Sequence, residues 1–471
     1  MNCKKILALL VCLTTILASC KKYLDVNPKS SISEEALFSS ETGFQQALDG
    51  VYSLFASRAL FGDNLSMGFE SALAQNYSIP TANTFYDTSN LNLTSAEVAG
   101  FGNDIWSNGY NAIAGANKVI QNTQDKRNVL SDQAYGRIRG EALALRAYMH
   151  FELLRLFGPE YVAGQNNKAI PYKTAVNQYT VIPSTTQVVV QKALADLKEA
   201  EQLLSNSDPI LTGDVTRRIK MNYYAVKALE ARIYLFSGDK NNAFAAAKTV
   251  VNANKFPFVS FNAATADASS RDRLYITEQI FGLRVANLRN WADQSYFRGA
   301  SSMRRSLSDY QTLYETASGG STDIRYLARI ETDNSVSNSG GNVFCSKFWQ
   351  TYPGTSPTDD RLDEIVPMLR LSEMYYILAE CAPSTVDGVN YLNMVRQNRN
   401  LTALAGNITQ AALSSEITKE YQKEFHAEGQ LFFYYKRKNV VRMQFKTSDI
   451  SLSQYVLPIP DSELEFNPNY K

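Results

Sequence analysis

The sequence predicts a mostly α-helical fold in which helix pairs stack as an α/α superhelix, with a loop-rich, irregular region packed against them. Three observations predict it. Apolar residues recur with helical spacing over long segments in both halves of the chain. Two such segments are joined by a Gly-Asp turn, as in a helical hairpin. Residues 256–360, in contrast, are rich in Gly, Ser, Asn and Asp.

The first nineteen residues predict a targeting segment. Lys4 and Lys5 precede an apolar run, Ile6 to Leu17, which is shorter than the ~20 residues that a membrane-spanning helix needs. The run leads into Leu17-Ala18-Ser19-Cys20, which resembles the lipobox of bacterial lipoproteins. We therefore expect residues 1–19 to be a lipoprotein signal peptide, Cys20 to carry the lipid, and residues 20–33 to be a tether. An ordinary signal peptide followed by a chance cysteine is the alternative.

Apolar stripes predict the helices that follow. Ala142, Leu145, Met149 and Leu153 lie on one face of a helix that ends at the strong breaker Phe157-Gly158-Pro159. A second stripe, from Val190 to Leu204, leaves its charged residues outside the apolar face. Stripes of this kind cover residues 34–57, 105–124, 139–157, 187–204 and 364–382.

One helix pair is similar to a tetratricopeptide (TPR) unit. The first helix runs from Tyr224 to Leu235, and Gly238-Asp239 forms the turn to a second helix that starts near Ala243. Small Ala231 stands where the two helices cross, because the backbones must approach closely there. A TPR-like helix cannot bury its apolar face alone, so further pairs are expected beside this one.

Residues 34–471 are predicted to form a single domain. Residues 34–255 form its helical, TPR-like half, and residues 256–471 combine the loop-rich region with closing helices. A short β-type run, Gln279 to Val285, interrupts the loops. Loops on a rigid scaffold are where binding residues concentrate.

Charge and cysteine usage exclude several classes of function. Without residues 1–19 the chain has 47 − 2 = 45 Lys and Arg against 46 Asp and Glu, so nothing attracts nucleic acid electrostatically. Cys345 and Cys381 are the cysteines left after Cys20, and two free thiols are favoured over a disulfide. Two isolated cysteines do not make a metal site.

The sequence predicts a binding protein and not an enzyme. It contains no nucleophile elbow, zinc-protease motif, phosphate loop or dinucleotide fingerprint. His150 lies in a predicted helix and His426 in a charged helix from Glu416 to Arg437, so structural roles are expected for both. The acidic run Asp359 to Glu364 has adjacent carboxyls, which rarely flank one glycosidic bond. No catalytic residue, metal or cofactor is predicted.

Aromatic residues in polar, irregular segments are the candidates for ligand binding, because flat rings stack on sugars while amide and guanidinium groups read hydroxyls. The chain has 27 Tyr, 23 Phe and 3 Trp but two His. Residues 287–299 and 76–87 are polar around their aromatics and carry no helical stripe. From these segments we predict six ligand-binding residues: Trp291, Tyr296, Tyr77, Tyr86, Asn76 and Arg298.

The order of short motifs resembles the SusD/RagB family of nutrient-binding outer-membrane lipoproteins over nearly the whole mature chain. After Cys20 come Tyr23-Leu-Asp, the helix Arg139-Gly-Glu-Ala-Leu-Ala-Leu-Arg-Ala-Tyr148, Ile170-Pro-Tyr, Ala228 to Asp239, Ile365-Val-Pro-Met-Leu-Arg-Leu-Ser-Glu-Met-Tyr375, Glu428-Gly and Leu457-Pro-Ile-Pro. Each motif is weak alone, and it is their order that carries the resemblance. Gln430-Leu-Phe-Phe-Tyr-Tyr departs from the family's usual Arg-x-Phe/Trp-Asp pattern.

The resemblance implies a lipid-anchored protein on the outer membrane, facing the cell exterior. Its partner would be a SusC-like, TonB-dependent transporter, to which it delivers a captured nutrient, by preference an oligosaccharide. Peptide or another non-glycan nutrient is the alternative ligand. A surface glycosidase is a more distant alternative, and it would need two carboxylates that face each other across a cleft.

Overall fold

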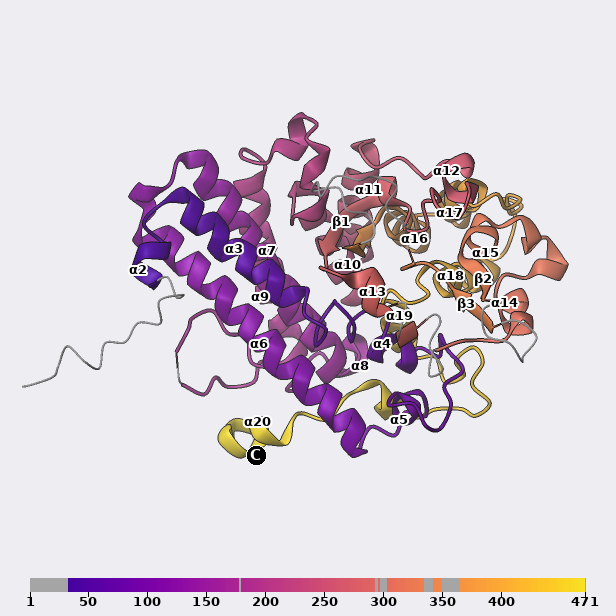
Figure 1. Cartoon of the computed structure of the whole chain (residues 1–471), viewed down its shortest axis with the longest axis horizontal. Coiled ribbons are helices and arrows are strands. Elements are labelled where there is room, and N and C mark those ends of the chain that lie inside the picture. The colour runs from indigo at the N-terminus through magenta and orange to yellow at the C-terminus, as the bar shows by residue number, and fades with distance from the viewer. Residues whose placement is uncertain are drawn as a thin grey trace, which may run out of the picture.

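A computed structural model describes residues 33–177, 179–292, 295–296, 303–333, 342–349 and 364–470 of the chain. The predicted signal peptide, Cys20 and Arg298 lie outside these residues. The prediction of a mostly α-helical fold is confirmed, since helices build most of the molecule and strands are few (Figure 1).

The N-terminal part is a set of packed helices. Helix α3 packs against α6, α6 against α7, and α7 against α9. Ser or Thr side chains cap the starts of the longer helices, as where Ser95 accepts from the Val98 amide and Ser131 from that of Ala134. The stripe 34–57 is split in two, because Ser40 starts a new helix there. The helices are α2 (Glu34–Leu37), α3 (Glu41–Phe55), α4 (Phe69–Leu73), α5 (Tyr86–Ser89), α6 (Ala96–Asp125), α7 (Asp132–Phe157), α8 (Tyr161–Gly164) and α9 (Thr186–Leu204).

The TPR-like pair consists of α10 (Tyr223–Phe236) and α11 (Lys240–Asn252). Gly238 at the turn has a φ of +78°, a conformation that glycine adopts without strain. Ala231 and Ala247 are fully buried between neighbours. The stack continues, because α11 packs on α16 (Leu371–Cys381), α16 on α17 (Thr385–Asn398), and α17 on α18 (Gln410–Glu424).

Two short antiparallel sheets lie within the loop-rich region. Strand β1 (Gln279–Arg284) pairs with β4 (Ile365–Arg370), and β2 (Ile330–Asp333) pairs with β3 (Asn342–Cys345). The helix predicted over 364–382 is therefore wrong in its first part. Residues 365–370 are buried on both faces, and a continuous apolar run fits a buried strand as well as a helix.

The loop-rich region also carries short helices, and two more short helices follow α18 toward the end of the chain. These are α12 (Phe261–Thr265), α13 (Leu288–Ala292), α14 (Leu307–Leu313), α15 (Ile324–Arg329), α19 (Leu431–Arg437) and α20 (Asp461–Phe466). The predicted helix from 416 to 437 is wrong, because α18 ends at Glu424 and α19 begins at Leu431. Ala427 and Gly429 between them have positive φ angles of 62° and 66°. His426 therefore lies in the segment between α18 and α19 and not within a helix.

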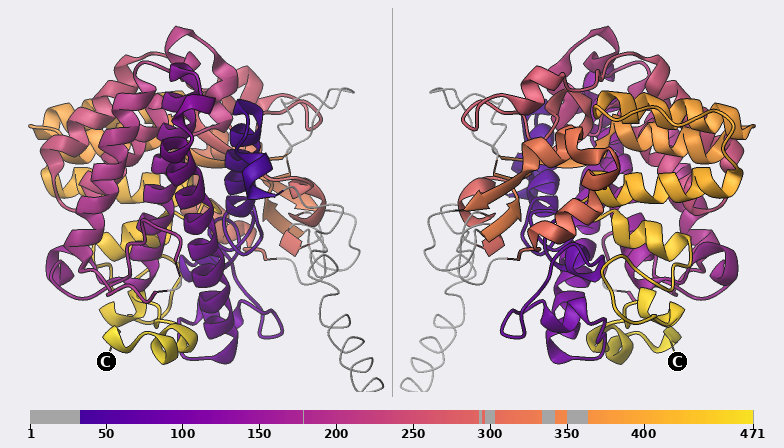
Figure 2. Two further views of the ribbon diagram at one scale, coloured as in Figure 1. Left: turned by 90° about the vertical axis from the view of Figure 1, so that its left-hand side faces the viewer. Right: turned by 90° about the vertical axis from the view of Figure 1, so that its right-hand side faces the viewer.

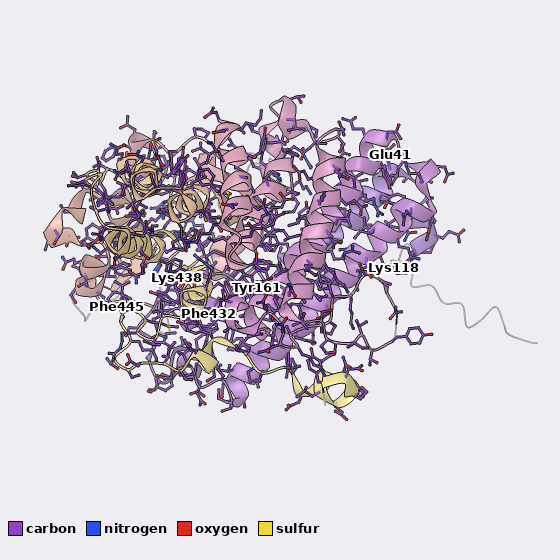
Figure 3. The ribbon with its side chains drawn as sticks, turned by 180° about the vertical axis from the view of Figure 1, so that it is seen from behind. Glu41, Lys118, Tyr161, Phe432, Lys438 and Phe445 are labelled. Atoms are coloured by element: carbon purple, nitrogen blue, oxygen red, sulfur yellow. The ribbon has the colours of Figure 1, made fainter. Side chains whose placement is uncertain are left out.

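Figure 2 shows the long N-terminal helices from one side and the β2–β3 ribbon with the closing helices from the other. Figure 3, from behind, places Glu41 and Lys118 at one end and Lys438 and Phe445 at the other. Cys345 is buried and Cys381 half-buried, and both thiols are free as favoured. Within the described ranges, no helix combines the length and the apolar character needed to cross a membrane.

Candidate functional site

A groove of about 760 Å³ opens where three distant parts of the chain meet. Its walls are the C-terminal part of α3 with the residues after it, the end of the 3₁₀ helix η3 (Val215–Ile219), and the segment from β1 to α13. In Figure 1, α13 and β1 lie next to the C-terminal end of α3. Two other hollows of the described chain are smaller, about 230 Å³ beside α17 and α18 and about 40 Å³ beside α19.

One wall of the groove is a stacked pair of an arginine and a tryptophan. The guanidinium carbon of Arg58 lies 4.6 Å from the ring centre of Trp291, a cation–π distance. Trp291 is half-buried, while 60% of the Arg58 side chain is exposed. The wall therefore combines a flat apolar surface with N–H donors.

A buried carboxylate holds Arg58 in this position. Nε and Nη2 of Arg58 donate to Oδ2 of Asp63 over 3.2 and 2.8 Å, and the hydroxyl of Tyr296 donates to Oδ1. Burial raises the pKa of Asp63, and the bonds from Tyr296 and Arg58 oppose that rise. Burial and the neighbouring carboxylate raise the pKa of Tyr296 well above its usual value, so its hydroxyl stays a donor.

Two glycines make room for this arrangement. The chain folds back tightly after α3, and a Cβ on Gly62 would lie 2.4 Å from the carbonyl oxygen of Ala56. A Cβ on Gly68 would lie 2.5 Å from Oδ1 of Asp63 and 2.8 Å from the Tyr296 hydroxyl. Gly68 thus leaves the space in which the carboxyl and the phenol meet.

The second wall carries a lysine over a tyrosine. Nζ of Lys220 lies 4.5 Å from the ring centre of Tyr52 and donates to Oδ1 of Asp49 over 2.6 Å. The hydroxyl of Tyr52 is directed into the protein, where it donates to Glu141 over 2.6 Å. Only the ring of Tyr52 is therefore offered to the groove.

The third wall is the end of β1. Nε of Arg284 lies 3.4 Å from Oε2 of Glu364, whose other oxygen accepts from the Asn287 amide over 3.2 Å. Asn287 has a φ of +56°, a left-handed conformation that asparagine tolerates better than most residues. This turn leads directly into α13 and sets the position of Trp291.

The five predicted ligand residues that the structure describes lie in different surroundings. Trp291 lines the groove. Tyr296 and Tyr77 are buried behind it, with ring centres 6.1 Å from Trp291 to Tyr296 and 6.4 Å from Tyr296 to Tyr77. Asn76 is buried, and Tyr86 lies exposed on α5 outside the groove lining. A ligand-binding role for these residues, and for Arg298 outside the described part, stays a prediction.

The groove residues that sequence reasoning missed are Asp49, Tyr52, Arg58, Lys220 and Arg284. No local motif marks them: Asp49 and Tyr52 lie within α3, Arg284 ends β1, and Arg58 and Lys220 follow α3 and η3.

The two histidines are structural, as expected from the sequence. Nε2 of His150 accepts from the Lys173 amide over 3.0 Å, and Nδ1 lies 2.9 Å from the Arg146 carbonyl, so Nδ1 carries the proton. Burial lowers the pKa of His150 to about 3. Burial also lowers the pKa of His426 well below its usual value. Both rings are therefore neutral near pH 7.

Comparison with known proteins finds similarity to SusD-like proteins over about half of the chain. A family model for SusD-like proteins, described as "Starch-binding associating with outer membrane", matches residues 22–235. SusD-like protein P25 of Formosa agariphila is 22% identical over 229 residues, which are 46% of this chain and 40% of that protein. SusD-like protein P38 of the same organism is 24% identical over 250 residues, or 51% and 44%. These matches support a SusD/RagB-type family for the chain.

Solved structures share the fold over almost the whole chain. A SusD superfamily protein of Bacteroides thetaiotaomicron has a TM-score of 0.72 at 20% identity, covering 91% of this chain and 98% of that one. A putative sugar binding protein of Bacteroides vulgatus has a TM-score of 0.70 at 21% identity, covering 92% and 97%. The curated relatives, in contrast, are matched over less than half of their own length.

Proposed function

We propose that this SusD-like protein captures a glycan at the outer membrane and delivers it to a SusC-like, TonB-dependent transporter. The observation that carries the proposal is the groove with half-buried Trp291 in its wall, flanked by charged hydrogen-bonding groups. Sugars bind to such surfaces because apolar C–H faces stack on aromatic rings while hydroxyls bond to the polar rim. The family description and the name of the Bacteroides vulgatus relative mention starch or sugar binding.

Binding without turnover is part of the proposal. Among the described residues that line the groove, Asp49 is the one carboxylate, and Asp63 is buried beneath Arg58. Glycoside hydrolysis ordinarily uses two carboxyl groups about 5–9.5 Å apart across the substrate. We expect purified protein to return every bound glycan unchanged.

Lipid anchoring through Cys20, with the body facing the exterior, completes the proposed function. It rests on the sequence before residue 33 and on the family. A Cys20→Ala variant should then leave the membrane fraction of cells, and quantitative retention there would contradict the anchor.

Replacement of Trp291 tests the groove. Trp291→Ala should weaken glycan binding about five-fold, because an aromatic contact contributes on the order of 1 kcal/mol. The matched control is Tyr179→Ala, which removes an exposed aromatic outside the groove lining. Affinity electrophoresis of both variants in polysaccharide gels, with thermal melting to check the fold, measures the difference. Equal retardation of the two variants would contradict the proposed site.

A further inference from the structure

A fully buried glutamate lies in the helix that follows the turn at Gly62 and Gly68. Glu70 belongs to α4 and has no exposed side-chain surface. Within the described ranges, neither oxygen of its carboxyl group accepts a hydrogen bond. An ionised carboxylate in such surroundings is strongly unfavourable, because it has lost the bonds to water that stabilise its charge. The neutral acid does not pay this cost.

The Glu70 carboxyl group faces another acceptor. A Cβ on Gly429 would lie 2.3 Å from Oε2 of Glu70 and 2.4 Å from the carbonyl oxygen of Leu65, so both oxygens border the same small space. Gly429 leaves that space open and has a φ of +66°, which glycine adopts without strain. No backbone N–H of the described chain donates to the Leu65 carbonyl. Two acceptors that border one space are reconciled by a proton between them, which a protonated carboxyl group supplies.

The nearest charges favour the protonated form of Glu70. Glu152 on α7 is a second buried carboxylate close to it, and Arg155 is bound to Glu152. Arg232 on α10 is bound to Glu373. Burial and Glu152 raise the pKa of Glu70 well above its usual value, although the two arginines oppose the rise.

The other elements beside α4 carry charges that have partners elsewhere or lie at the surface. On α5, Tyr86 is exposed and Asp87 is half-buried. Helix α19 packs on α4 (Figure 1) and carries Lys436 and Arg437. These two and Glu428 beside Gly429 are bound to the carbonyls of Arg155 and Gly158, to Glu380, and to Lys347 with Arg370, respectively.

The Leu65 carbonyl belongs to the turn that holds Arg58. The Leu65 amide donates to the Leu60 carbonyl over 2.9 Å, and the Asn64 amide donates to the Arg58 carbonyl over 3.1 Å. Asp63, which fixes the Arg58 guanidinium, lies in the same turn. A shift of Leu65 therefore moves the wall of the groove that Arg58 forms.

We propose that Glu70 is a positioning residue of the groove, which is protonated and donates its carboxyl O–H to the Leu65 carbonyl, and whose ionisation as the pH rises loosens the turn. The effect on ligand binding rests on the proposed function, whereas the protonation of Glu70 does not. When Glu70 ionises, its proton passes to solvent and two acceptors are left facing each other.

The raised pKa gives different pH dependences for stability and for binding. Below pH 4.5, the usual pKa of the group, Glu70 is protonated in the folded and the unfolded chain, and its full contribution to stability is present. Above pH 4.5 the unfolded chain ionises first, so stability is lost as the pH rises toward the folded pKa. Glycan affinity depends on the folded protein alone and falls only when Glu70 itself ionises.

A Glu70→Gln variant of the full mature protein tests the protonation, because the glutamine amide donates at every pH. Near pH 4 the urea midpoints of wild type and variant should be similar. From pH 4.5 to pH 9 the wild-type midpoint should fall progressively below that of Glu70→Gln. The exposed Asp104→Asn on α6 is the control and should follow the wild type. Infrared difference spectra at pH 7 should show the carbonyl band of a protonated carboxyl group in the wild type and its loss in Glu70→Gln.

A Glu70→Leu variant tests the positioning role, since leucine is uncharged but cannot donate. The probe is whichever of starch, dextran, xylan and galactomannan binds the wild type most tightly at pH 6. Glu70→Gln should keep the wild-type affinity, and Glu70→Leu should bind several-fold more weakly at every pH. Wild-type affinity should decrease between pH 6 and pH 9, while that of Glu70→Gln stays level. Thermal melting checks that each variant folds.

The outcomes separate this proposal from the proposed function. Parallel stability curves for wild type and Glu70→Gln, with no difference in the infrared band, would show that Glu70 is ionised and overturn the inference. Equal glycan affinity of Glu70→Gln and Glu70→Leu would overturn the positioning role while glycan binding stands. If none of the four polysaccharides binds at any pH, the proposed function fails and the positioning role fails with it, whereas the infrared band and the stability curves still decide the protonation.

Discussion

Arg58 owes its place in the groove to residues that lie behind it. Asp63 accepts two of its N–H bonds, and Tyr296 donates to the other oxygen of that carboxylate. Gly68 has no side chain in the space where these two groups meet. The exposed Arg58 side chain is thus held by the buried carboxylate of Asp63. This fixes the position of its N–H donors, although an arginine side chain is otherwise flexible.

Gly68→Ala tests this support at the scale of single residues. The added methyl would lie 2.5 Å from Oδ1 of Asp63 and 2.8 Å from the Tyr296 hydroxyl, so the pair must move apart. We expect glycan affinity to fall several-fold and the free energy of unfolding to fall by about 1–3 kcal/mol, as for an overpacked core. Gly100→Ala is the control, because it lies in α6 with no atom within 4 Å of a new Cβ. Urea titration measures the free energy of unfolding, and gel retardation measures glycan affinity. Equal affinity in the two variants would show that Gly68 does not support the position of Arg58.

At the scale of elements, the closing helices are joined to the stack by buried ion pairs. Glu424 at the end of α18 contacts Arg325, Arg370 and Arg399, all of them buried. The charge spacing of the Glu416–Lys423 run is typical of a solvated helix face, yet Glu420 and Lys423 are buried. Helical charge spacing looks the same whether the partner is solvent or a distant arginine, so the pattern alone could not distinguish the two.

The pair between α16 and α19 gives a pH dependence. Although burial alone would raise the pKa of Glu380, the Arg437 guanidinium, bonded at 2.6 and 2.8 Å, lowers it to about 2 from a usual 4.5. Because the folded pKa is the lower one, the pair stabilises the protein fully above pH 4.5. That contribution is lost as the pH falls toward 2, about 3 kcal/mol in all.

A Glu380→Gln variant should therefore lose less stability than the wild type between pH 6 and pH 3. Urea titrations at several pH values over this range measure the free energy of unfolding of each protein. The exposed Asp104→Asn on α6 serves as the control, and its stability should fall with pH as that of the wild type does. Parallel curves for wild type and Glu380→Gln would show that this pair does not titrate as described.

Elements with their own start and stop signals could be predicted from the sequence. Helix α7 ends at Phe157 before Gly158-Pro159, and α10 ends before Gly238, because the breaker is local. The strand at 365–370 and the break around His426 could not be predicted. Strand β4 depends on its pairing with β1, some 80 residues earlier, and the break depends on positive φ angles at Ala427 and Gly429.

On the scale of the whole molecule, the groove exists only after α3, η3, β1 and α13 have come together. Trp291 could be predicted because its sequence neighbours are polar, which is local information. Arg58 could not, since Trp291, against which it stacks, and Tyr296, which bonds its partner Asp63, lie more than 200 residues further along the chain. The helical stack is therefore predictable from sequence, while the walls of the groove depend on contacts between distant segments.

The central claim is that this groove binds the ligand of the protein. A crystal structure of the full mature protein with a fragment of the polysaccharide that it binds most tightly tests it most directly. The account predicts a saccharide in the groove against Trp291, with oxygens within about 3 Å of Arg58 and Asp49, an ordinary hydrogen-bond distance. A saccharide seated at the hollow beside α17 and α18, with the groove empty, would contradict it.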